Sequence, residues 1–447
     1  MNNKKNVLVI SRKYPPEGGS SVQRPFKFTK YLPQFNWIPQ VLTSKADVEL
    51  KDESFLSDLS NDVKVIRTFT LEPECLKISI NSKWKSNNSF KLMMMVFLKV
   101  FSIFYYRVAI PDWSIGWVPF AYRKAKEIIK DKRIDIIYVH NQPPSSLLVG
   151  YILKKKFGIP LVLDYTDPWS TSDHYFPVDR LKRNLINYIE KKILTAADCI
   201  VYCKKSILDE IKIFYKNLNY EKFLFIPHGY DSDDFFNSAI EKSPSKFRFF
   251  YMGKLTNNFC YSPRILFKAL SFLINNKRIK PEKMEVILAG QISTEHSSLI
   301  RKLNLQSCVR HLGYLNHLEC IGLLKSADAT ILLIESQKGR IITNQFSGSM
   351  PAKIFEYLYT GKPILAIIPE GPEAEILKQA NIGFFANPND PDSISNALLN
   401  LYHKIVTKRE DIRPNWKYIR SFERKKQTKM IADIFNSLSI SGKIENI

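Results

Sequence analysis

The sequence lacks paired cysteines and long uncharged apolar runs, and each absence excludes a class of protein. Its six cysteines form no Cys-x-x-Cys pair, which disfavours a zinc site of the usual spacing and predicts reduced thiols in a cytosolic protein. The apolar run at 7–10 is too short for the core of a signal peptide. No uncharged run approaches the roughly 18–20 residues that span a bilayer. We therefore expect a cytoplasmic location and no membrane-spanning helix.

Acidic residues are also scarce, because 43 aspartates and glutamates stand against 66 lysines and arginines, which gives a net charge of +23. Three explanations for this charge are open. An A/T-rich genome favours lysine codons, nucleic-acid binding needs a basic surface, and an anionic membrane attracts one. The chain has no zinc-finger spacing, no RNA-binding aromatic signature and no basic leucine zipper. We therefore predict no nucleic-acid partner and favour an anionic membrane as one contribution.

The region 84–117 is the stretch that suggests a membrane. Residues 90–110 are rich in Leu, Met, Val, Phe and Tyr and are interrupted by Lys91, Lys99 and Arg107. A helix with an apolar body and basic interruptions can lie in the membrane interface, a layer that the nearby tryptophans also prefer. The alternative is a buried helix of the first domain. The sequence leaves both alternatives open.

A chain of 447 residues is too long for one ordinary core and predicts two domains. Short apolar runs alternate with helical stretches, which indicates an α/β fold with parallel sheets. We expect a first domain over 1–236, a linker over 237–246, a second domain over 247–415 and a C-terminal helix over 416–447 that crosses back to the first domain. The expected strands are 7–10, 39–43, 64–67, 134–139, 160–164, 198–202 and 223–226 in the first domain, and 247–251, 284–289, 309–312, 329–334, 363–368 and 383–386 in the second.

The segment 349–368 is the most informative part of the chain. Ser349 can cap a helix whose first turn holds Pro351. Gly361 can adopt the left-handed conformation that ends a helix. The apolar run 363–368 is typical of a strand that is covered on both faces. The segment therefore predicts a helix, a glycine stop and a buried strand.

The start of this helix carries a cation and a carboxylate. The free backbone amides of a helix start favour a phosphate. Lys353 and Glu356 lie three residues apart and therefore share a helix face. A cation beside a phosphate and a carboxylate one turn deeper suit a nucleotide diphosphate, because the carboxylate can accept hydrogen bonds from the ribose hydroxyls. The plain alternative is a helical ion pair on an ordinary βαβ unit.

The same segment resembles the donor-sugar motif of family 4 glycosyltransferases, in the branch with a Pro-x-Lys-x-Phe-Glu-Tyr-Leu core followed by Gly-Lys-Pro. The resemblance implies a GT-B fold, in which two Rossmann-like domains with parallel sheets face a cleft. It also implies that Ser349, Lys353 and Glu356 bind the donor. The wider family has a further glutamate, separated from Glu356 by seven residues, and Gly348 occupies that position here. That carboxylate is therefore missing here, and two explanations are open: the backbone of Gly348 or Ser349 makes the usual contact to the donor sugar ring, or the donor itself differs.

A glycine-containing loop follows the first strand of each half. Gly18 and Gly19 let the backbone approach a ligand closely. Their loop begins Tyr14-Pro-Pro and resembles the family's N-terminal loop, which faces donor and acceptor. In the second half, the resemblance implies that Lys254, after Gly253, contacts the donor diphosphate. Fixed cations would stabilise the charge of the leaving diphosphate, so no metal or other cofactor is expected.

Two carboxylates follow the expected strand at 160–164. Asp164 and Asp167 stand at its carboxyl end, where ligands of parallel sheets bind. Asp167-Pro-Trp resembles the family's Asp-x-Trp segment, which implies a catalytic or acceptor-orienting role for Asp167. The alternative is that Asp167 caps the next turn. Asp231-Ser-Asp233 spells a motif that binds metal in other proteins, but its context is the family's Gly-x-Asp turn, so we predict no metal site.

The resemblance implies a glycosyltransferase that moves a sugar, with retention of configuration and without metal, from a nucleotide diphosphate sugar to an acceptor hydroxyl. The basic charge and the region 84–117 favour a glycan or lipid-linked acceptor at the inner face of the plasma membrane, as in bacterial surface polysaccharide assembly. Two alternatives stay open. One is a GT-B-fold epimerase that acts on the same nucleotide sugars. The other is a non-catalytic binding or scaffold subunit, which the missing glutamate favours.

Overall fold

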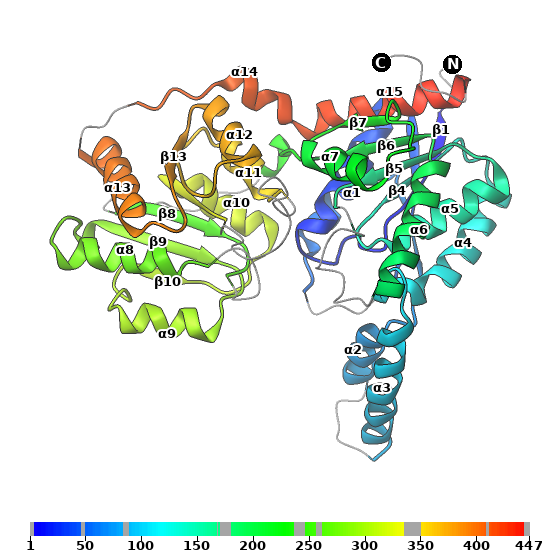
Figure 1. Ribbon diagram of the computed structural model, residues 1–447, viewed down its shortest axis with the longest axis horizontal. Coiled ribbons are helices and arrows are strands. Elements are labelled where there is room, and N and C mark those ends of the chain that lie inside the picture. The colour runs from blue at the N-terminus through cyan, green and yellow to red at the C-terminus, as the bar shows by residue number, and fades with distance from the viewer. Residues whose placement is uncertain are drawn as a thin grey trace. The chain divides into compact units, whose positions relative to one another are not determined.

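The structure is a computed structural model that describes residues 4–45, 50–83, 89–167, 169, 180–236, 246–255, 262–334, 350–407 and 411–441. Its contacts divide the chain into two compact units (Figure 1). Unit 1 comprises Met1–Pro227 with Lys425–Ile447, and unit 2 comprises His228–Arg424. Each unit contains one parallel sheet, which confirms the predicted α/β class. The predicted linker at 237–246 lies outside the described residues apart from Lys246.

Unit 1 is built on a seven-stranded sheet with the order β3-β2-β1-β4-β5-β6-β7. All strands expected in the first half form. The apolar runs of the central strands are buried, whereas the edge strands β3 and β7 are partly exposed. The strands are β1 (Lys5–Ile10), β2 (Trp37–Ser44), β3 (Lys64–Thr68), β4 (Ile136–His140), β5 (Leu161–Tyr165), β6 (Cys199–Tyr202) and β7 (Phe223–Phe225).

The helices of unit 1 come from both ends of the chain (Figure 1). The last helix packs its Phe435 ring 5.2 Å from the ring of Trp37 and 5.8 Å from that of Tyr138, so the C-terminus completes a core made by the first strands. The helices are α1 (Ser20–Tyr31), α2 (Pro73–Lys83), α3 (Ser89–Val108), α4 (Val118–Asp131), α5 (Ser145–Phe157), α6 (Arg180–Ala196), α7 (Lys205–Phe214) and α15 (Arg424–Ser441).

The strand order of unit 1 reverses between β1 and β4. From β1 the chain continues through α1 to β2 on one side, whereas from β4 it continues through α5 to β5 on the other. The loops that follow β1 and β4 therefore diverge, and this divergence is where open α/β sheets bind ligands. Gly18 and Gly19 belong to the loop after β1, and Asp167 follows β5, the next strand of the sheet.

Unit 2 repeats this plan with six parallel strands in the order β10-β9-β8-β11-β12-β13, which reverses between β8 and β11. All expected strands of the second half form. They are β8 (Phe247–Met252), β9 (Met284–Ala289), β10 (Val309–His311), β11 (Ala329–Leu333), β12 (Ile364–Ile367) and β13 (Gly383–Ala386). The helices are α8 (Arg264–Asn275), α9 (Thr294–Lys302), α10 (His317–Ser326), α11 (Lys353–Tyr359), α12 (Pro372–Ala380), α13 (Pro391–Tyr402) and α14 (Trp416–Ile419).

Helix α11 differs from its prediction at its start and agrees at its end. It begins at Lys353, and its capping position is taken by Ala352, which makes no side-chain cap. The predicted cap, Ser349, is therefore wrong, and Ser349 itself lies outside the described residues. Gly361 has φ +64°, and a Cβ there would lie 2.6 Å from the Trp416 ring, so both backbone and packing require glycine. Strand β12 follows at once, fully buried as predicted.

Helices α2 and α3 form a hairpin that projects from the sheet of unit 1 (Figure 1). Only Leu98 and Tyr105 of α3 are buried among its described side chains. Phe97 is 62% exposed and Phe104 is 66% exposed. The sequence left a buried helix and an interfacial helix open for this segment, and the exposure of α3 shows that the buried-helix alternative is wrong.

Candidate functional site

In unit 2, Lys353 lies against the turn that follows β8. Its Nζ donates a hydrogen bond to the Met252 carbonyl at 3.1 Å and sits 4.0 Å from the centre of the Tyr251 ring. A Cβ built on Gly253 would lie 3.2 Å from the same Nζ. Lys254 comes next and is exposed to solvent. The two lysines expected to bind the diphosphate therefore belong to one loop-and-helix arrangement at the strand-order reversal of unit 2.

The ammonium group of Lys353 is held where its charge is costly. Burial lowers the pKa of Lys353 to about 7, although the carboxylate of Glu356 acts in the opposite direction. An anionic ligand beside Nζ would favour the protonated form. The positive charge on Lys353 would therefore increase if an anion bound beside Nζ.

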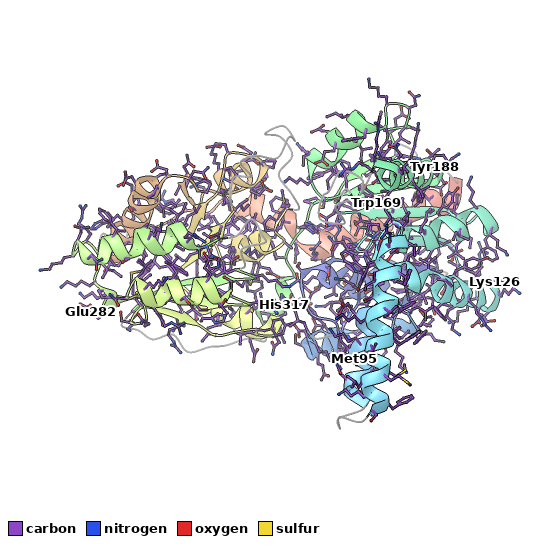
Figure 2. All side chains as sticks on the ribbon, turned by 60° about the horizontal axis from the view of Figure 1, so that its bottom comes forward. Met95, Lys126, Trp169, Tyr188, Glu282 and His317 are labelled. Atoms are coloured by element: carbon purple, nitrogen blue, oxygen red, sulfur yellow. The ribbon has the colours of Figure 1, made fainter. Side chains whose placement is uncertain are left out.

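Glu356 is buried one turn beyond Lys353, beside a histidine that the sequence analysis did not select. His317 begins α10, and its Nε2 lies 3.0 Å from Asp234 Oδ2 and 3.8 Å from Glu356 Oε1 (Figure 2). The imidazole thus stands between two carboxylates. No motif in the sequence singles out His317, because its role follows from the packing of α10 beside α11 and not from its spacing along the chain.

Close backbone contact fixes the turn that carries Lys254. The Gly253 N–H donates to the Ala289 carbonyl at 2.8 Å. Gly253 has φ +126° and Gly290 has φ +127°, backbone angles that residues other than glycine rarely adopt. A Cβ on Gly290 would lie only 2.2 Å from the Gly253 carbonyl oxygen. The glycines at these two positions therefore allow the loops after β8 and β9 to touch.

In unit 1, the loop with Gly18 and Gly19 is tied down by charged groups. Gly18 N–H donates to the Leu50 carbonyl at 2.9 Å, and Gly19, with φ +106°, precedes α1. The buried Arg12 guanidinium binds Glu72 through two hydrogen bonds of 2.9 and 2.7 Å and Glu17 through one of 3.1 Å. A Cβ on Gly19 would meet no atom within 4 Å, so open space adjoins the backbone there.

Asp164 is fully committed to other side chains of unit 1. The Arg24 Nε lies 2.9 Å from both of its oxygens, and His140 Nδ1 lies 2.9 Å from Oδ2. Burial alone would raise the pKa of Asp164, but the Arg24 guanidinium and His140 hold it well below its usual range. Asp164 is therefore a structural anion, and Arg24, which the sequence analysis did not assign, is its counter-ion.

Asp167 keeps one carboxylate oxygen uncommitted. Its backbone carbonyl accepts a hydrogen bond of 2.7 Å from Asn141 Nδ2, and its Oδ2 accepts one from Gln142 Nε2. Oδ1 is buried and has no hydrogen-bond partner in the described part of the chain. A buried carboxylate oxygen without a hydrogen bond costs free energy. Oδ1 is therefore suited to accept a hydrogen bond from a hydroxyl group of a ligand.

The predicted site residues thus fall into two groups. Lys254, Lys353 and Glu356 come together in unit 2, whereas Gly18, Gly19 and Asp167 belong to unit 1, and each group stays a prediction as a ligand site. Ser349 cannot be placed because it lies outside the described residues. The Asp-x-Asp sequence has a local role, since the Asp231 carboxylate accepts the Asp233 N–H at 3.2 Å and caps the turn Ser232–Phe235.

Family models match the two halves of the chain in succession. The model for Glycosyltransferase Family 4 matches residues 96–234, and the model for Glycosyl transferases group 1 matches residues 234–417. This chain belongs to the family 4-like glycosyltransferases. The match places the enzyme among proteins that transfer sugar from nucleotide diphosphate sugars. None of the curated proteins matches the sequence significantly.

Solved structures share the GT-B fold of this glycosyltransferase over nearly its whole length. Anabaena HepE in complex with UDP and glucose is 15% identical, with a TM-score of 0.63 and coverage of 97% of this chain and 100% of HepE. Sucrose-phosphate synthase from Thermosynechococcus elongatus is 14% identical, with a TM-score of 0.63 and coverage of 97% and 99%. WaaG, a glycosyltransferase involved in lipopolysaccharide biosynthesis, is 13% identical, with a TM-score of 0.55 and coverage of 98% of each chain. At these identities the likeness concerns the fold alone.

Proposed function

We propose that this glycosyltransferase moves a hexose, with retention of configuration, from a nucleotide diphosphate sugar to a hydroxyl of a glycan or lipid-linked acceptor in bacterial surface polysaccharide or glycolipid assembly. The observation that carries the proposal is the position of Lys353, whose Nζ lies against the turn after β8 with Glu356 buried one turn deeper. This turn stands where the strand order of unit 2 reverses, the usual place for a nucleotide in such sheets.

Each residue has a stated role in this proposal. Lys254 and Lys353 hold the diphosphate, and the carboxylate of Glu356 accepts hydrogen bonds from the ribose hydroxyls. As the bond between sugar and diphosphate breaks, negative charge grows on the leaving phosphate, and fixed cations stabilise that charge without reorganisation. In this proposal the two lysines supply the positive charge in place of a metal. The Ser349 backbone is the proposed contact to the donor sugar, because Gly348 stands where the family has a glutamate.

Unit 1 would supply the acceptor side. Asp167 Oδ1 would accept a hydrogen bond from the hydroxyl of the acceptor substrate, since it is buried and has no hydrogen-bond partner in the described part of the chain. Gly18 and Gly19 would let the backbone approach the substrates closely, and a Cβ built on Gly19 would meet no atom within 4 Å. The fold shared with WaaG, a glycosyltransferase involved in lipopolysaccharide biosynthesis, is in keeping with a surface glycan as acceptor. We place the enzyme in the cytoplasm, at the inner face of an anionic membrane.

The test is nucleotide release from UDP-, GDP- and dTDP-sugars, with and without a membrane lipid extract. Wild type is compared with Glu356→Ala and with Glu375→Ala, an exposed glutamate of the same unit. Release that depends on the extract, disappears in Glu356→Ala and persists in Glu375→Ala would establish transfer and name the donor class. Turnover of the donor to an epimer without acceptor would favour the epimerase instead. Absence of binding and turnover for every donor would leave the scaffold alternative.

A further inference from the structure

The outer side of α3 is an apolar surface with no covering element in the described part of unit 1. Helix α3 is long and apolar enough, by length and composition, to cross a membrane. Such a helix is usually the core of a soluble protein, but α3 is not buried. Leu92 is 68% exposed, and Phe97 and Phe104 are 62% and 66% exposed. The explanation that normally accounts for an apolar helix therefore fails here.

The exposed residues lie on one side of the helix. The following residues are exposed, and their spacings of one, three and four positions place them on one side of a helix: Leu92, Val96, Phe97, Val100, Ile103 and Phe104. The opposite side, with Leu98 and Tyr105, is buried beside α2. In Figure 2, Met95 marks the half of this helix that lies toward its projecting end. The neighbouring α4 shows the ordinary pattern, since it buries Ala121 and Ala125 and exposes Arg123.

The charge of the α2–α3 hairpin indicates what covers this face. Between residues 73 and 108 the sequence holds six basic residues and one acidic residue, Glu74. Glu74 lies at the root of the hairpin, 3.5 Å from the Tyr106 hydroxyl. A second copy of the hairpin would bring twelve like charges together, twice the six of one copy, which disfavours self-association. Anionic lipids complement both features of the hairpin. Their headgroups attract its basic residues, and their acyl chains contact its apolar face.

We propose that the outward face of α3 lies in the interface of an anionic lipid membrane and anchors unit 1 to it. The helix lies along the surface and does not span the bilayer, because Lys99 stands at its middle and α2, its partner in the hairpin, is polar. The apolar face would reach about 5–10 Å into the headgroup and acyl boundary. This proposal deepens the proposed function, because it names the surface that contacts the membrane. It rests on that function only in taking the acceptor to be bound at the membrane.

The root of the hairpin is held firmly within unit 1. Glu72 immediately precedes α2, and its carboxylate accepts two hydrogen bonds from Arg12, which lies in the loop after β1. At the other end, the Tyr105 hydroxyl donates to the Trp113 carbonyl at 2.6 Å and accepts the Gly116 N–H at 2.9 Å. The hairpin is thus fixed to the same loop that carries Gly18 and Gly19. A membrane bound by α3 would therefore lie in a defined direction from that loop.

The test is flotation of the full chain with vesicles of phosphatidylcholine alone and of phosphatidylcholine with about 30% phosphatidylglycerol, whose anionic headgroups give the vesicle surface a negative potential. The variant Phe97→Glu/Phe104→Glu is compared with Ile213→Glu/Phe214→Glu, a pair on α7 whose side chains are also more than half exposed. We expect the α3 variant to lower the vesicle partition coefficient about tenfold or more, since each lost apolar contact weakens insertion. The α7 variant should stay within about twofold of wild type.

A second arm tests the charges and the depth of insertion. Lys99→Gln/Arg107→Gln should remove most of the preference for anionic vesicles, whereas Lys155→Gln/Lys156→Gln, exposed on α5, should keep it. Alkaline carbonate should release the bound protein. Resistance to carbonate would overturn the interfacial position in favour of a spanning helix. Equal flotation of wild type and the α3 variant would overturn the anchor, and so would a wild-type dimer that this variant dissociates without any vesicle binding.

The same samples separate this inference from the proposed function. UDP-glucose binding is measured on wild type, the α3 variant and Lys353→Met. Lost flotation with retained nucleotide binding in the α3 variant supports the anchor. Flotation that persists in an enzyme with no turnover of any nucleotide sugar would leave the anchor standing and overturn the proposed transfer.

Discussion

Asp164 and Asp167 lie three residues apart, yet their surroundings differ. Both oxygens of Asp164 face Arg24, and the pair is buried. Asp167 shares one oxygen with Gln142 and leaves Oδ1 without a partner in the described residues. Removing one member of a buried ion pair leaves the other charge uncompensated, which costs about 3–5 kcal/mol. Removing a carboxylate whose oxygen has no partner costs little in stability.

We therefore expect Asp164→Asn to lower the free energy of unfolding by about 3 kcal/mol and Asp167→Asn to change it by less than about 1 kcal/mol. Sugar transfer should fall at least about a hundredfold in Asp167→Asn, because a positioned carboxylate is lost. Urea unfolding and nucleotide release measure the two effects. Because the pKa of Asp164 is depressed, its contribution is complete above the ordinary aspartate pKa and disappears as the pH falls below it. An unstable Asp167→Asn variant would show that its role is structural.

Lys353 predicts how donor binding depends on pH. Its pKa of about 7 leaves much of the site neutral at pH 8, while a bound diphosphate favours the ammonium form. Binding therefore takes up a proton, and affinity for a nucleotide sugar should fall as pH rises from 7 to 9, by at most about tenfold per pH unit. Calorimetry of UDP-glucose binding in buffers of different ionisation enthalpy measures the uptake directly.

Lys353→Met provides the control for this titration. Without the amine, the variant should bind UDP-glucose weakly and with no pH dependence between 7 and 9. A wild type whose affinity is flat over this range would show that Lys353 does not meet the diphosphate.

The sequence predicted that Lys353 and Glu356 share a helix face, but it did not predict the surroundings of either side chain. Spacing alone placed Lys353 and Glu356 on one helix face, since helical geometry is local. The ring of Tyr251 under Nζ and the imidazole of His317 beside Glu356 come from strands and helices far apart in the chain. Such contacts depend on tertiary packing, which no periodicity encodes. The helix start was misplaced because a good capping residue, Ser349, does not fix where the first turn forms.

At the scale of the element, the contact between Gly253 and Gly290 predicts a sharp effect of one methyl group. Gly290→Ala would place Cβ 2.2 Å from the Gly253 carbonyl, so the turn before Lys254 must move. We expect this variant to lose stability by about 2 kcal/mol or more and to bind UDP-glucose at least about tenfold more weakly. Gly158→Ala is the control, because Gly158 also has a positive φ of 70° but meets no atom within 4 Å.

Thermal unfolding and UDP-glucose titration of both glycine variants decide the matter. Gly158→Ala should lose about 1 kcal/mol from backbone strain and keep its donor affinity. If wild type and Gly290→Ala bind the donor equally well, the turn after β8 is not part of the donor site.

The elements themselves were largely predictable from the sequence, with α3 as the instructive exception. Central strands such as β4 and β12 are short apolar runs, and burial on both faces leaves little choice of structure. Helix α3 is apolar on nearly all sides, so its sequence cannot reveal which side is covered. The outcome depends on whether another element packs on the outer face. No single-chain pattern decides that question, and here the structure leaves the face exposed.

At the scale of the whole molecule, the chain forms two units with separate cores, and unit 1 is closed by its last helix. Phe435 of α15 lies in the core of unit 1 beside Trp37 and Tyr138. The proposed donor residues Lys254, Lys353 and Glu356 all belong to unit 2. Unfolding should therefore proceed in two transitions, each of which responds to a different perturbation.

Phe435→Ala should lower the free energy of unfolding of unit 1 by about 3–5 kcal/mol, because it leaves a cavity in the core of that unit. The unfolding transition of unit 2 should stay unchanged. UDP-glucose at a hundred times its dissociation constant should raise the free energy of unfolding of unit 2 by about 2.7 kcal/mol. This stabilisation should disappear in Lys353→Met. Differential scanning calorimetry resolves both shifts. A single transition moved by both perturbations would show that the units unfold together, and a nucleotide that raises only the transition sensitive to Phe435→Ala would place the donor in unit 1.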